Sequence, residues 1–470
     1  MRLKKGNRIM AVLGTADRPL RVAIVGSGPS GFYAAEALAR QDLNIKVDMF
    51  DKMPVPYGLV RYGVAPDHFK IKTVTKVFEK TANKPKFSFF GNVTVGKDIT
   101  VFELNRFYDA VIFAYGAESD RRLGIKGEDL AGSYTATEFV AWYNGHPDFQ
   151  NRHFDLSHEV AVIIGNGNVA MDVARVLCKT TDELEKTDIC SNALEILSES
   201  KIKEVHLYGR RGPLQASFTS KEVREMGDLA DCYPVIDPQD LVLNESSQKE
   251  LEDPSNSGRK KNYEIMQEFA KIAPNERKRK FVMHFYRSPI EIIGKEQVRK
   301  AKFEINLLSG EPNKQKVRGT GKFEEIDCGI LFRSVGYAGV PIEGLPFSDA
   351  SGIVPNQAGR VMDSEKIFTG WYVAGWIKTG PVGVIGTNKP AAEETVKSLL
   401  EDKDNLNACE VPSTDELMKF LKERNVKMVT FEDWKTIDAA EILRGSELGK
   451  PREKFAHITG MLSAIFKKRY

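Results

Sequence analysis

Apolar and polar positions follow two alternating periodicities near the start of the chain. An apolar run at 20–26, LRVAIVG, is followed by a glycine-rich helical stretch at 27–41 and a second strand pattern, IKVDMFD, at 45–51. The same order of strand, glycine turn, helix and strand recurs between 158 and 211. Strands that alternate with helices predict parallel, doubly wound α/β sheets. Two such units more than a hundred residues apart favour two Rossmann-like nucleotide domains over one.

Further patterns lie around and within the second unit. YDAVIFAYGAES at 108–119 is typical of a buried strand that ends at a glycine, and we take it as the exit from the first domain. DCGILFRSVGYAG at 327–339 predicts a strand that leads back to it. Residues 244–262 are polar with Pro and Gly and predict a mobile surface excursion, and ERKRK at 276–280 predicts another charged surface segment. The tail from Pro412 has a polar, helical pattern.

The first glycine turn, GSGPSG at 26–31, carries the chemistry of a dinucleotide loop. Gly26 allows the tight turn, Gly28 lets the backbone approach a pyrophosphate, and Gly31 permits close helix–strand contact. The helix that follows offers free N–H groups and a partial positive charge to phosphates. Asp51, at the end of the next strand, can accept hydrogen bonds from both ribose hydroxyls and so selects an unphosphorylated ribose. The alternative is a structural turn without a ligand, which the complete pattern disfavours.

The second glycine turn, GNGNVA at 165–170, has Ala170 in place of the third glycine. Its second strand ends in Arg210 and Arg211 rather than in an acid. Two guanidinium groups at that position can pair with a ribose 2′-phosphate through charge-assisted, often bidentate hydrogen bonds. We therefore expect FAD at the first loop and NADPH at the second. The alternative for the arginines is a solvated surface pair.

Composition is consistent with a multidomain globular enzyme. The 470 residues suffice for two or three domains, and 41% hydrophobic with 28% charged residues is an ordinary balance. A formal net charge of +3 gives no indication of nucleic-acid binding, and no apolar run is long enough for a transmembrane helix. The five cysteines are scattered without a C-x-x-C pair, which argues against a disulfide framework, a zinc site and a dithiol redox centre.

The first twenty residues are basic, with five Lys or Arg side chains against Asp17 as the one acid. A basic, acid-poor start is typical of a mitochondrial transit peptide. A frayed or vector-derived N-terminus is the alternative, and these residues alone do not decide between the two.

Four long segments resemble the adrenodoxin reductases, the mitochondrial-type NADPH:ferredoxin reductases. They are VPYGLVRYGVAPDH (55–68), GNGNVAMDVARVL (165–177), YGRRGPLQASFTSKEVREM (208–226) and AGWIKTGPVGVIGTN (374–388). The resemblance implies a glutathione-reductase-like α/β fold in which an NADP domain is inserted into a discontinuous FAD domain. We expect FAD-domain segments at 20–115 and 335–470, the second with a C-terminal helical tail, and the NADP domain at 116–334.

The resemblance also implies site residues. Those expected at FAD, beyond the loop glycines, are Ser30, Asp51, Leu59 and Val95, with Trp376, Gly383, Val384 and Ile385 against the isoalloxazine ring. Those expected at NADP are Gly167, Asn168, Val169, Ala170, Arg210, Arg211 and Glu222, with Gly383 near the nicotinamide. Two positions depart from the family: Thr379 stands where it has arginine, and Asp51 where it has glutamate.

Two titratable residues are candidates for the catalytic centre. His68 ends the APDH segment, and Asp172 lies one turn into the second glycine-loop helix. A general acid–base role suits a histidine, but hydride transfer between nicotinamide and flavin needs no side-chain proton donor. A structural hydrogen-bonding role for both residues is the alternative.

The resemblance implies hydride transfer from NADPH to FAD, then single-electron transfer to a [2Fe–2S] ferredoxin that serves iron–sulfur cluster assembly or a mitochondrial monooxygenase. We expect an acidic ferredoxin to dock at Arg259, Lys260 and Lys261, with 277–280 as the second candidate. The resemblance also implies a location in the mitochondrial matrix, and it is compatible with peripheral association with the inner membrane. Two alternatives stay open, a disulfide-reductase or amidotransferase-like flavoprotein and a nucleotide-binding sensor without turnover. The absence of C-x-x-C and cysteine-rich cluster motifs disfavours the first.

Overall fold

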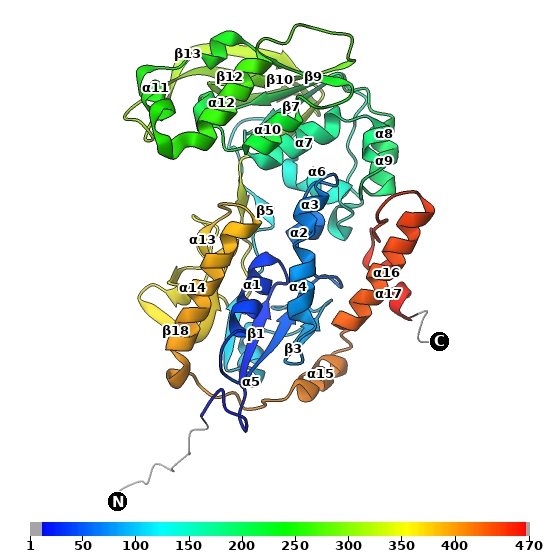
Figure 1. The fold of residues 1–470 in the computed structure, drawn as a ribbon, viewed down its shortest axis with the longest axis vertical. Helices are drawn as coiled ribbons and strands as arrows, with labels where there is room; N and C mark the ends of the chain where they lie inside the picture. The colour runs from blue at the N-terminus through cyan, green and yellow to red at the C-terminus, as the bar shows by residue number, and fades with distance from the viewer. Residues whose placement is uncertain (1–11, 467–470) are drawn as a thin grey trace, which may run out of the picture.

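The computed structural model describes residues 12–466, which form two halves around two large sheets (Figure 1). Residues 1–11, which make up most of the basic segment that is either a transit peptide or a frayed or vector-derived N-terminus, therefore lie outside the described residues. The first sheet is drawn from both ends of the chain and has the order β16-β17-β18-β4-β1-β2-β3. Its strands are β1 (Leu20–Val25), β2 (Ile45–Phe50), β3 (Phe87–Phe90), β4 (Ala110–Phe113), β16 (Asn356–Gln357), β17 (Arg360–Asp363) and β18 (Lys366–Val373).

The centre of the first sheet is parallel and covered on both faces. Strand β1 pairs in parallel with β2 and β4, and all six of its residues are buried, which explains its continuous apolar pattern. Val22 and Ile24 join the core on one face, and Ala23 and Val25 join the core on the other. The first face is covered by α1 (Pro29–Leu38), α4 (Thr75–Ala82) and α14 (Asn388–Glu401), and the second by α5 (Val101–Phe107) and α15 (Thr414–Glu423).

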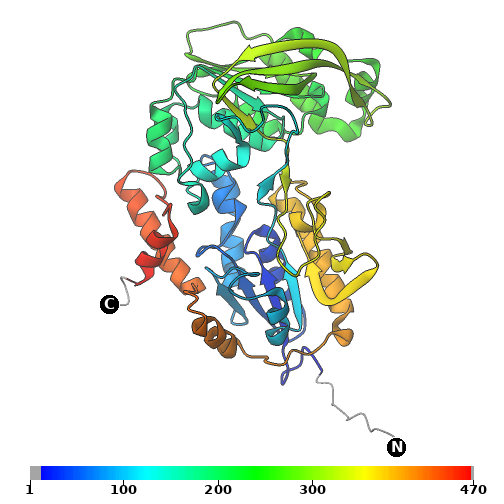
Figure 2. The ribbon, with the colours of Figure 1, turned by 180° about the vertical axis from the view of Figure 1, so that it is seen from behind.

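The second sheet is entirely parallel, in the order β6-β14-β7-β8-β10-β9. A three-stranded antiparallel sheet packs on it through Val298, Ala301 and Phe303, and this long curved sheet lies across the far end of the molecule in Figure 2. The strands are β6 (Ser133–Thr135), β7 (Val160–Ile164), β8 (Glu204–Tyr208), β9 (Cys232–Ile236), β10 (Arg279–His284) and β14 (Ile330–Arg333), with β11 (Arg287–Gly294), β12 (Val298–Ser309) and β13 (Lys316–Asp327) in the antiparallel sheet. Helices that pack in the core of this half include α6 (Ala136–Tyr143), α7 (Asn168–Cys178) and α10 (Ser220–Glu225).

The chain crosses between the halves through two adjacent segments. β5 (Ser119–Asp120) pairs with β15 (Tyr337–Ala338) in an antiparallel ribbon, so the outgoing and returning chains lie side by side. The ribbon lies at the ends of 108–119 and 327–339, the segments that the sequence predicts as exit and return.

Residues 244–262 are not the loop that their composition predicts. They form α11 (Glu245–Glu252) and the start of α12 (Ser257–Phe269), and the side chain of Asn244 accepts a hydrogen bond from the Ser247 N–H in the first turn of α11. Buried Asn262, Met266 and Phe269 fix α12 to the domain. The 276–280 segment is also only partly a surface run, because Arg279 and Lys280 begin β10. The polar composition of this segment therefore predicts a loop, although the segment contains the start of α12, an amphipathic helix that buries few residues.

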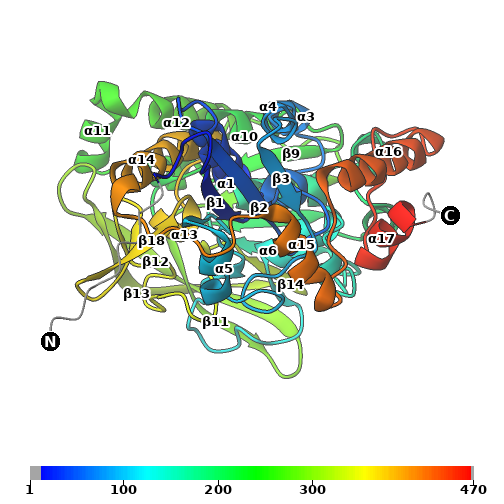
Figure 3. The ribbon, with the colours of Figure 1, turned by 90° about the horizontal axis from the view of Figure 1, so that it is seen from below.

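The C-terminal tail lies along one side of the first half, as the view from below shows (Figure 3), and it extends towards the second half in Figure 1. It contains α15, α16 (Phe431–Glu447) and α17 (Ile458–Phe466). Buried Glu441 of α16 pairs with Arg61, while Lys454 reaches Asp188 at 3.3 Å. Lys72, from the first half, meets the same Asp188 carboxylate at 2.6 Å. The tail thus ties the two halves together with buried ion pairs.

Candidate functional site

The first glycine loop has the geometry of a phosphate cradle. Gly26 has φ +109°, and a Cβ there would lie 2.5 Å from the Ala114 carbonyl oxygen. A Cβ on Gly31 would lie 2.1 Å from the Gly26 carbonyl oxygen, so helix and loop need glycine at both places. Gly28 faces open space and caps α1 without a side-chain hydrogen bond. The N–H groups of α1 are therefore available to a pyrophosphate, as the fit of a dinucleotide requires.

Asp51 and its neighbours surround this loop. The Asp51 carboxylate accepts hydrogen bonds from the Ser27 N–H at 2.9 Å and the Ser27 hydroxyl at 2.5 Å. Burial raises the pKa of Asp51, and the Ser27 hydrogen bonds oppose the rise. The segment of Leu59 packs on the loop, since a Cβ on Gly58 would lie 3.1 Å from the Gly28 Cα. Buried Val95 follows a strand extension in which the Val93 N–H bonds to the Asp51 carbonyl.

The segment 375–388 closes over the same loop. A Cβ on Gly375 would lie 2.2 Å from the Ser30 hydroxyl oxygen, which brings the neighbouring Trp376 beside the first dinucleotide loop. Gly383 has φ +82°, and a Cβ there would meet the Thr387 hydroxyl at 2.1 Å. Gly383 and Val384 lie exposed, with Ile385 half-buried, and Thr379 is also exposed. The structure therefore brings the residues expected at FAD into one region.

The second glycine loop has the same backbone geometry as the first. Gly165 has φ +130°, and a Cβ there would lie 2.1 Å from the Ser334 carbonyl oxygen. Gly167 faces open space and caps α7 without a side-chain hydrogen bond. The Asn168 side chain accepts the Thr219 N–H at 2.8 Å, so the 217–219 turn packs on the loop. Val169 and Ala170 follow on the first turn of α7.

Arg210 and Arg211 stand just beyond the end of β8, beside this loop. Asn306 and Tyr286 donate hydrogen bonds to the Arg210 and Arg211 carbonyl oxygens, which fixes the backbone. Within residues 12–466 neither guanidinium has a carboxylate within ion-pair distance. Arg210 is exposed and Arg211 half-buried. Two unpaired guanidinium groups next to an open glycine loop fit a phosphorylated ribose.

A buried ion-pair network joins the two halves next to these loops. Arg175 on α7 bonds to Asp67 at 2.8 Å, to Asp172 at 2.6 Å and to Glu222 at 2.9 Å. Asp67 belongs to the first half, whereas Asp172 and Glu222 belong to α7 and α10 of the second. One guanidinium therefore holds carboxylates from both halves.

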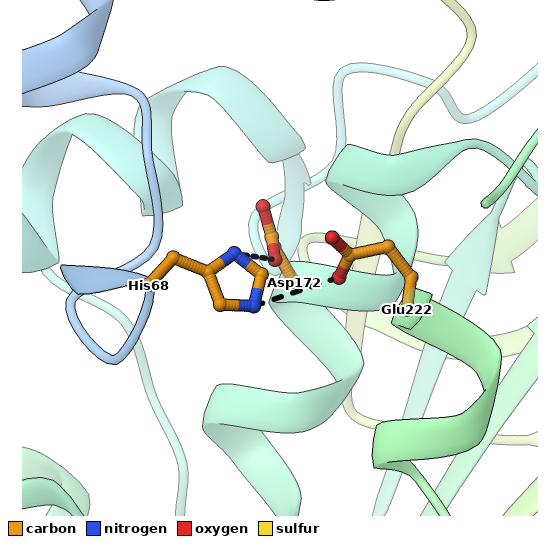
Figure 4. A group of neighbouring side chains, drawn as sticks. All are labelled: His68, Asp172 and Glu222. Atoms are coloured by element: carbon orange, nitrogen blue, oxygen red, sulfur yellow. Dashed lines mark ion pairs between the residues drawn. The ribbon is translucent and has the colours of Figure 1, made fainter. Parts of the chain in front are cut away.

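His68 enters this network from the first half, as Figure 4 shows. Its Nε2 lies 2.9 Å from Glu225 and 3.8 Å from Glu222, and its Nδ1 lies 3.9 Å from Asp172. Burial, and then the negative charge of Asp172, raises the pKa of Glu222 to about 7, and burial raises that of Asp172. The two candidate catalytic residues thus lie together, and Glu222, expected at NADP, faces Arg175 beside them.

Sequence reasoning missed the centre of this cluster. Arg175 lies three residues after Asp172 on an otherwise apolar helix, and its side chain is 1% exposed. A charged pair at that spacing in a buried helix is a signal for an internal ion pair. Asp67 and Glu225 carry no such signal, because their partners come from distant segments.

Known proteins match the chain closely. A family model described as pyridine nucleotide-disulphide oxidoreductase matches residues 20–226. The NADPH-ferredoxin reductase FprA of Mycobacterium tuberculosis is 46% identical over 95% of this chain and 99% of its own length. The human mitochondrial NADPH:adrenodoxin oxidoreductase is 41% identical over 96% of this chain and 93% of its own length. A solved structure of M. tuberculosis FprA in complex with NADPH has a TM-score of 0.89 at 46% identity, covering 96% of this chain and 100% of that one.

The two sheets and their glycine loops define a pyridine-nucleotide oxidoreductase with two dinucleotide-binding units. The chain belongs to the adrenodoxin reductase family, because relatives above 40% identity match it over nearly their full lengths. The resemblance seen in four sequence segments is confirmed, and so is the predicted α/β fold class.

Proposed function

We propose that the protein is an NADPH:ferredoxin oxidoreductase, which takes hydride from NADPH onto FAD and delivers single electrons to a [2Fe–2S] ferredoxin. The observation that carries the proposal is the difference between the two loops, Asp51 after the first and Arg210 with Arg211 after the second. The names of the matched relatives support it. FAD supplies, when bound, the conversion of a two-electron hydride into single electrons.

We assign the two cofactors to the two loops. FAD is held by Gly26, Gly28, Ser30, Gly31, Asp51, Leu59 and Val95, with Trp376, Gly383, Val384 and Ile385 at its reactive ring; NADP is held by Gly167, Asn168, Val169, Ala170, Arg210, Arg211 and Glu222, with Gly383 near the nicotinamide. Support comes from the open faces of Gly28 and Gly167 and from the free arginine pair. The proposed domain limits are 20–115 and 335–470 for FAD and 116–334 for NADP.

His68 and Asp172 are assigned to the catalytic centre through their place in the Arg175 network. They lie where the first half meets α7 and α10. His68 forms a hydrogen bond with Glu225 at 2.9 Å and lies within 4 Å of the Glu222 and Asp172 carboxylates, so one side chain of the first half contacts both helices of the second. Their role is to fix the contact between the nucleotide-binding halves and to hold charge near the reacting rings.

The experiment for cofactor choice replaces Arg210 and Arg211 by glutamine. Each charge-assisted contact to a 2′-phosphate contributes about 1.5–3 kcal/mol, so KM for NADPH rises at least about tenfold per contact. KM for NADH changes little, because NADH lacks that phosphate. Steady-state kinetics with a small neutral acceptor gives both values. Equal losses with both cofactors would show that these arginines are structural and would refute the assignment.

The ferredoxin is proposed to dock on the exposed Lys260 and Lys261 of α12, where Arg259 is also present. Opposite charges accelerate encounter and are screened by salt. Charge reversal at Lys260 and Lys261 should weaken ferredoxin reduction and flatten its salt dependence, while reduction of the small acceptor by NADPH persists. The 277–280 run is the second candidate, although Arg279 binds carbonyl oxygens of the domain itself. Unchanged salt dependence after reversal at both clusters would place docking elsewhere.

We also propose that the protein is located in the mitochondrial matrix. Its electrons would then serve iron–sulfur cluster assembly or a monooxygenase. Both bacterial and mitochondrial relatives match the chain, and the basic first twenty residues support the mitochondrial alternative. Within residues 12–466 no helix is both long and apolar enough to cross a membrane. Peripheral contact with the inner membrane is part of the proposal. Fractionation of the source cell, with the N-terminus of the recovered protein sequenced, tests the location.

A further inference from the structure

The carboxylate of Glu250 on α11 is the centre of a buried polar cluster behind the second nucleotide loop. Glu250 is 1% exposed. It accepts hydrogen bonds from the Gln215 side chain at 2.9 Å, from the Asn313 N–H at 2.7 Å and from the Gln315 side chain at 2.8 Å. Its one cationic partner within residues 12–466 is Arg259, whose guanidinium lies 3.5 Å away. A buried charge needs such a partner, so Arg259 has a definite place.

This cluster connects α12 to the turn that carries the arginine pair. Gln215 ends the turn Pro213–Gln215, which begins two residues after Arg211. The same carboxylate oxygen of Glu250, Oε2, accepts the hydrogen bond from Gln215 and pairs with Arg259. The Arg259 side chain also donates a hydrogen bond to the Asn313 side-chain oxygen at 2.9 Å. Through Glu250, Arg259 of α12 is therefore linked to the turn that follows Arg211.

The guanidinium groups of Arg210, Arg211 and Arg259 therefore lie close enough for their charges to interact, and the Glu250 carboxylate lies among them. Burial, and then the positive charges of Arg210 and Arg259, lowers the pKa of Arg211, and the charge of Glu250 opposes this. Glu250 offsets one of the three positive charges, which leaves an excess at the end of β8. Like charges this close repel each other, and an anion placed between them relieves the repulsion. The Arg259 side chain is 41% exposed and is thus accessible to a ligand.

We propose that Arg259 is a third cation of the 2′-phosphate site and determines the preference for a phosphorylated ribose together with Arg210 and Arg211. It neutralises Glu250, which would otherwise repel the phosphate, and its side chain adds a third guanidinium group close enough to Arg211 for the two charges to interact. This inference rests on the proposed function. It separates Arg259 from Lys260 and Lys261, which project into solvent from the same helix.

The test measures binding of 2′,5′-ADP and of 5′-ADP to the FAD-loaded protein by isothermal titration calorimetry. These probes share the adenosine and differ in the 2′-phosphate. Arg259→Gln should weaken 2′,5′-ADP about tenfold and leave 5′-ADP within twofold, and Arg259→Lys should recover most of the loss because it keeps the charge. The matched control is Lys249→Gln, which removes an exposed lysine paired with Glu245 on α11 and should change neither affinity.

Each outcome decides between the proposals. If Arg259→Gln keeps the wild-type preference for 2′,5′-ADP, or weakens both probes equally, Arg259 serves only to neutralise Glu250 and the inference is wrong. If the wild-type protein itself shows no preference, the 2′-phosphate site of the proposed function fails instead. Arg259→Gln leaves a buried carboxylate without its cation, so Arg259→Gln combined with Glu250→Gln provides a variant with no unpaired charge. This double variant should also lose preference for 2′,5′-ADP, because it lacks the third cation, and retained preference would overturn the inference.

Discussion

Replacing Glu222 by glutamine tests whether the buried network holds this carboxyl group protonated near neutral pH. Glu222 is 5% exposed and shares Arg175 with Asp172. Burial, and then the charge of Asp172, raises its pKa from the usual 4.5 to about 7. That difference corresponds to about 3 kcal/mol between the protonated and ionised forms in the folded protein.

The sign of the effect follows from proton uptake. Below pH 4.5 Glu222 is protonated in both states, and between pH 4.5 and 7 only the folded state keeps the proton. Folding then binds a proton, so the stability that Glu222 contributes is complete below 4.5 and is lost as the pH rises through 7. Relative to Glu222→Gln, the wild-type protein should therefore lose up to about 3 kcal/mol of unfolding free energy between pH 4.5 and 8.

The assay is urea unfolding of the FAD-loaded protein, followed by circular dichroism at half-unit pH intervals, with the wild type and the variant compared at each pH. The comparison cancels titrations that both proteins share. Glu225→Gln is the matched control. Burial would raise the pKa of Glu225, but the hydrogen bond with His68 and the charge of Arg175 lower it, so this variant should lose stability relative to the wild type above pH 4.5. A constant difference between wild type and Glu222→Gln across this range would refute the reasoning.

Three further predictions concern the network, the first loop and the flavin. Arg175→Met leaves buried carboxylates without their cation and should cost about 3–5 kcal/mol of unfolding free energy in urea melts; a loss below 1 kcal/mol would contradict this. Gly31→Ala places a methyl group 2.1 Å from the Gly26 carbonyl oxygen and should cost about 1–3 kcal/mol and release flavin on gel filtration, so full retention would be contrary evidence. FAD should be bound non-covalently, so acid precipitation should leave it in the supernatant; flavin that stays with the pellet would be unexpected.

Much of the fold was readable from the sequence because local patterns and tertiary structure agree. Each of the two glycine loops follows a strand and precedes a helix. The hydrophobic periodicity, the turn residues and the burial therefore all indicate the same strand–turn–helix unit. The region 244–262 differs from its predicted loop, since α12 buries only Asn262, Met266 and Phe269 and its polar residues resemble those of a loop. Helices that bury a narrow stripe give a weak periodic signal.

The site was predictable only in part. The loop residues and arginines stand at fixed spacings from their strands, and spacing is visible in a sequence. The pairing of Arg175 with Asp67 joins residues 108 positions apart, and the link from Arg259 through Glu250 to Gln215 joins three segments. Such contacts depend on how the two halves and α12 pack, which no local pattern encodes.

The most direct test of the proposed function is an anaerobic titration of the purified FAD protein with NADPH and, separately, with NADH. The flavin absorbance should bleach with about one equivalent of NADPH per FAD, since a hydride carries both electrons that the flavin accepts. NADH should require a much higher concentration, because it lacks the phosphate that the arginines bind. Addition of an oxidised [2Fe–2S] ferredoxin should restore the yellow colour while about two ferredoxins are reduced per FAD. A flavin that NADPH does not bleach, or a bleached flavin that no such ferredoxin reoxidises, would contradict electron transfer from NADPH through FAD to a ferredoxin.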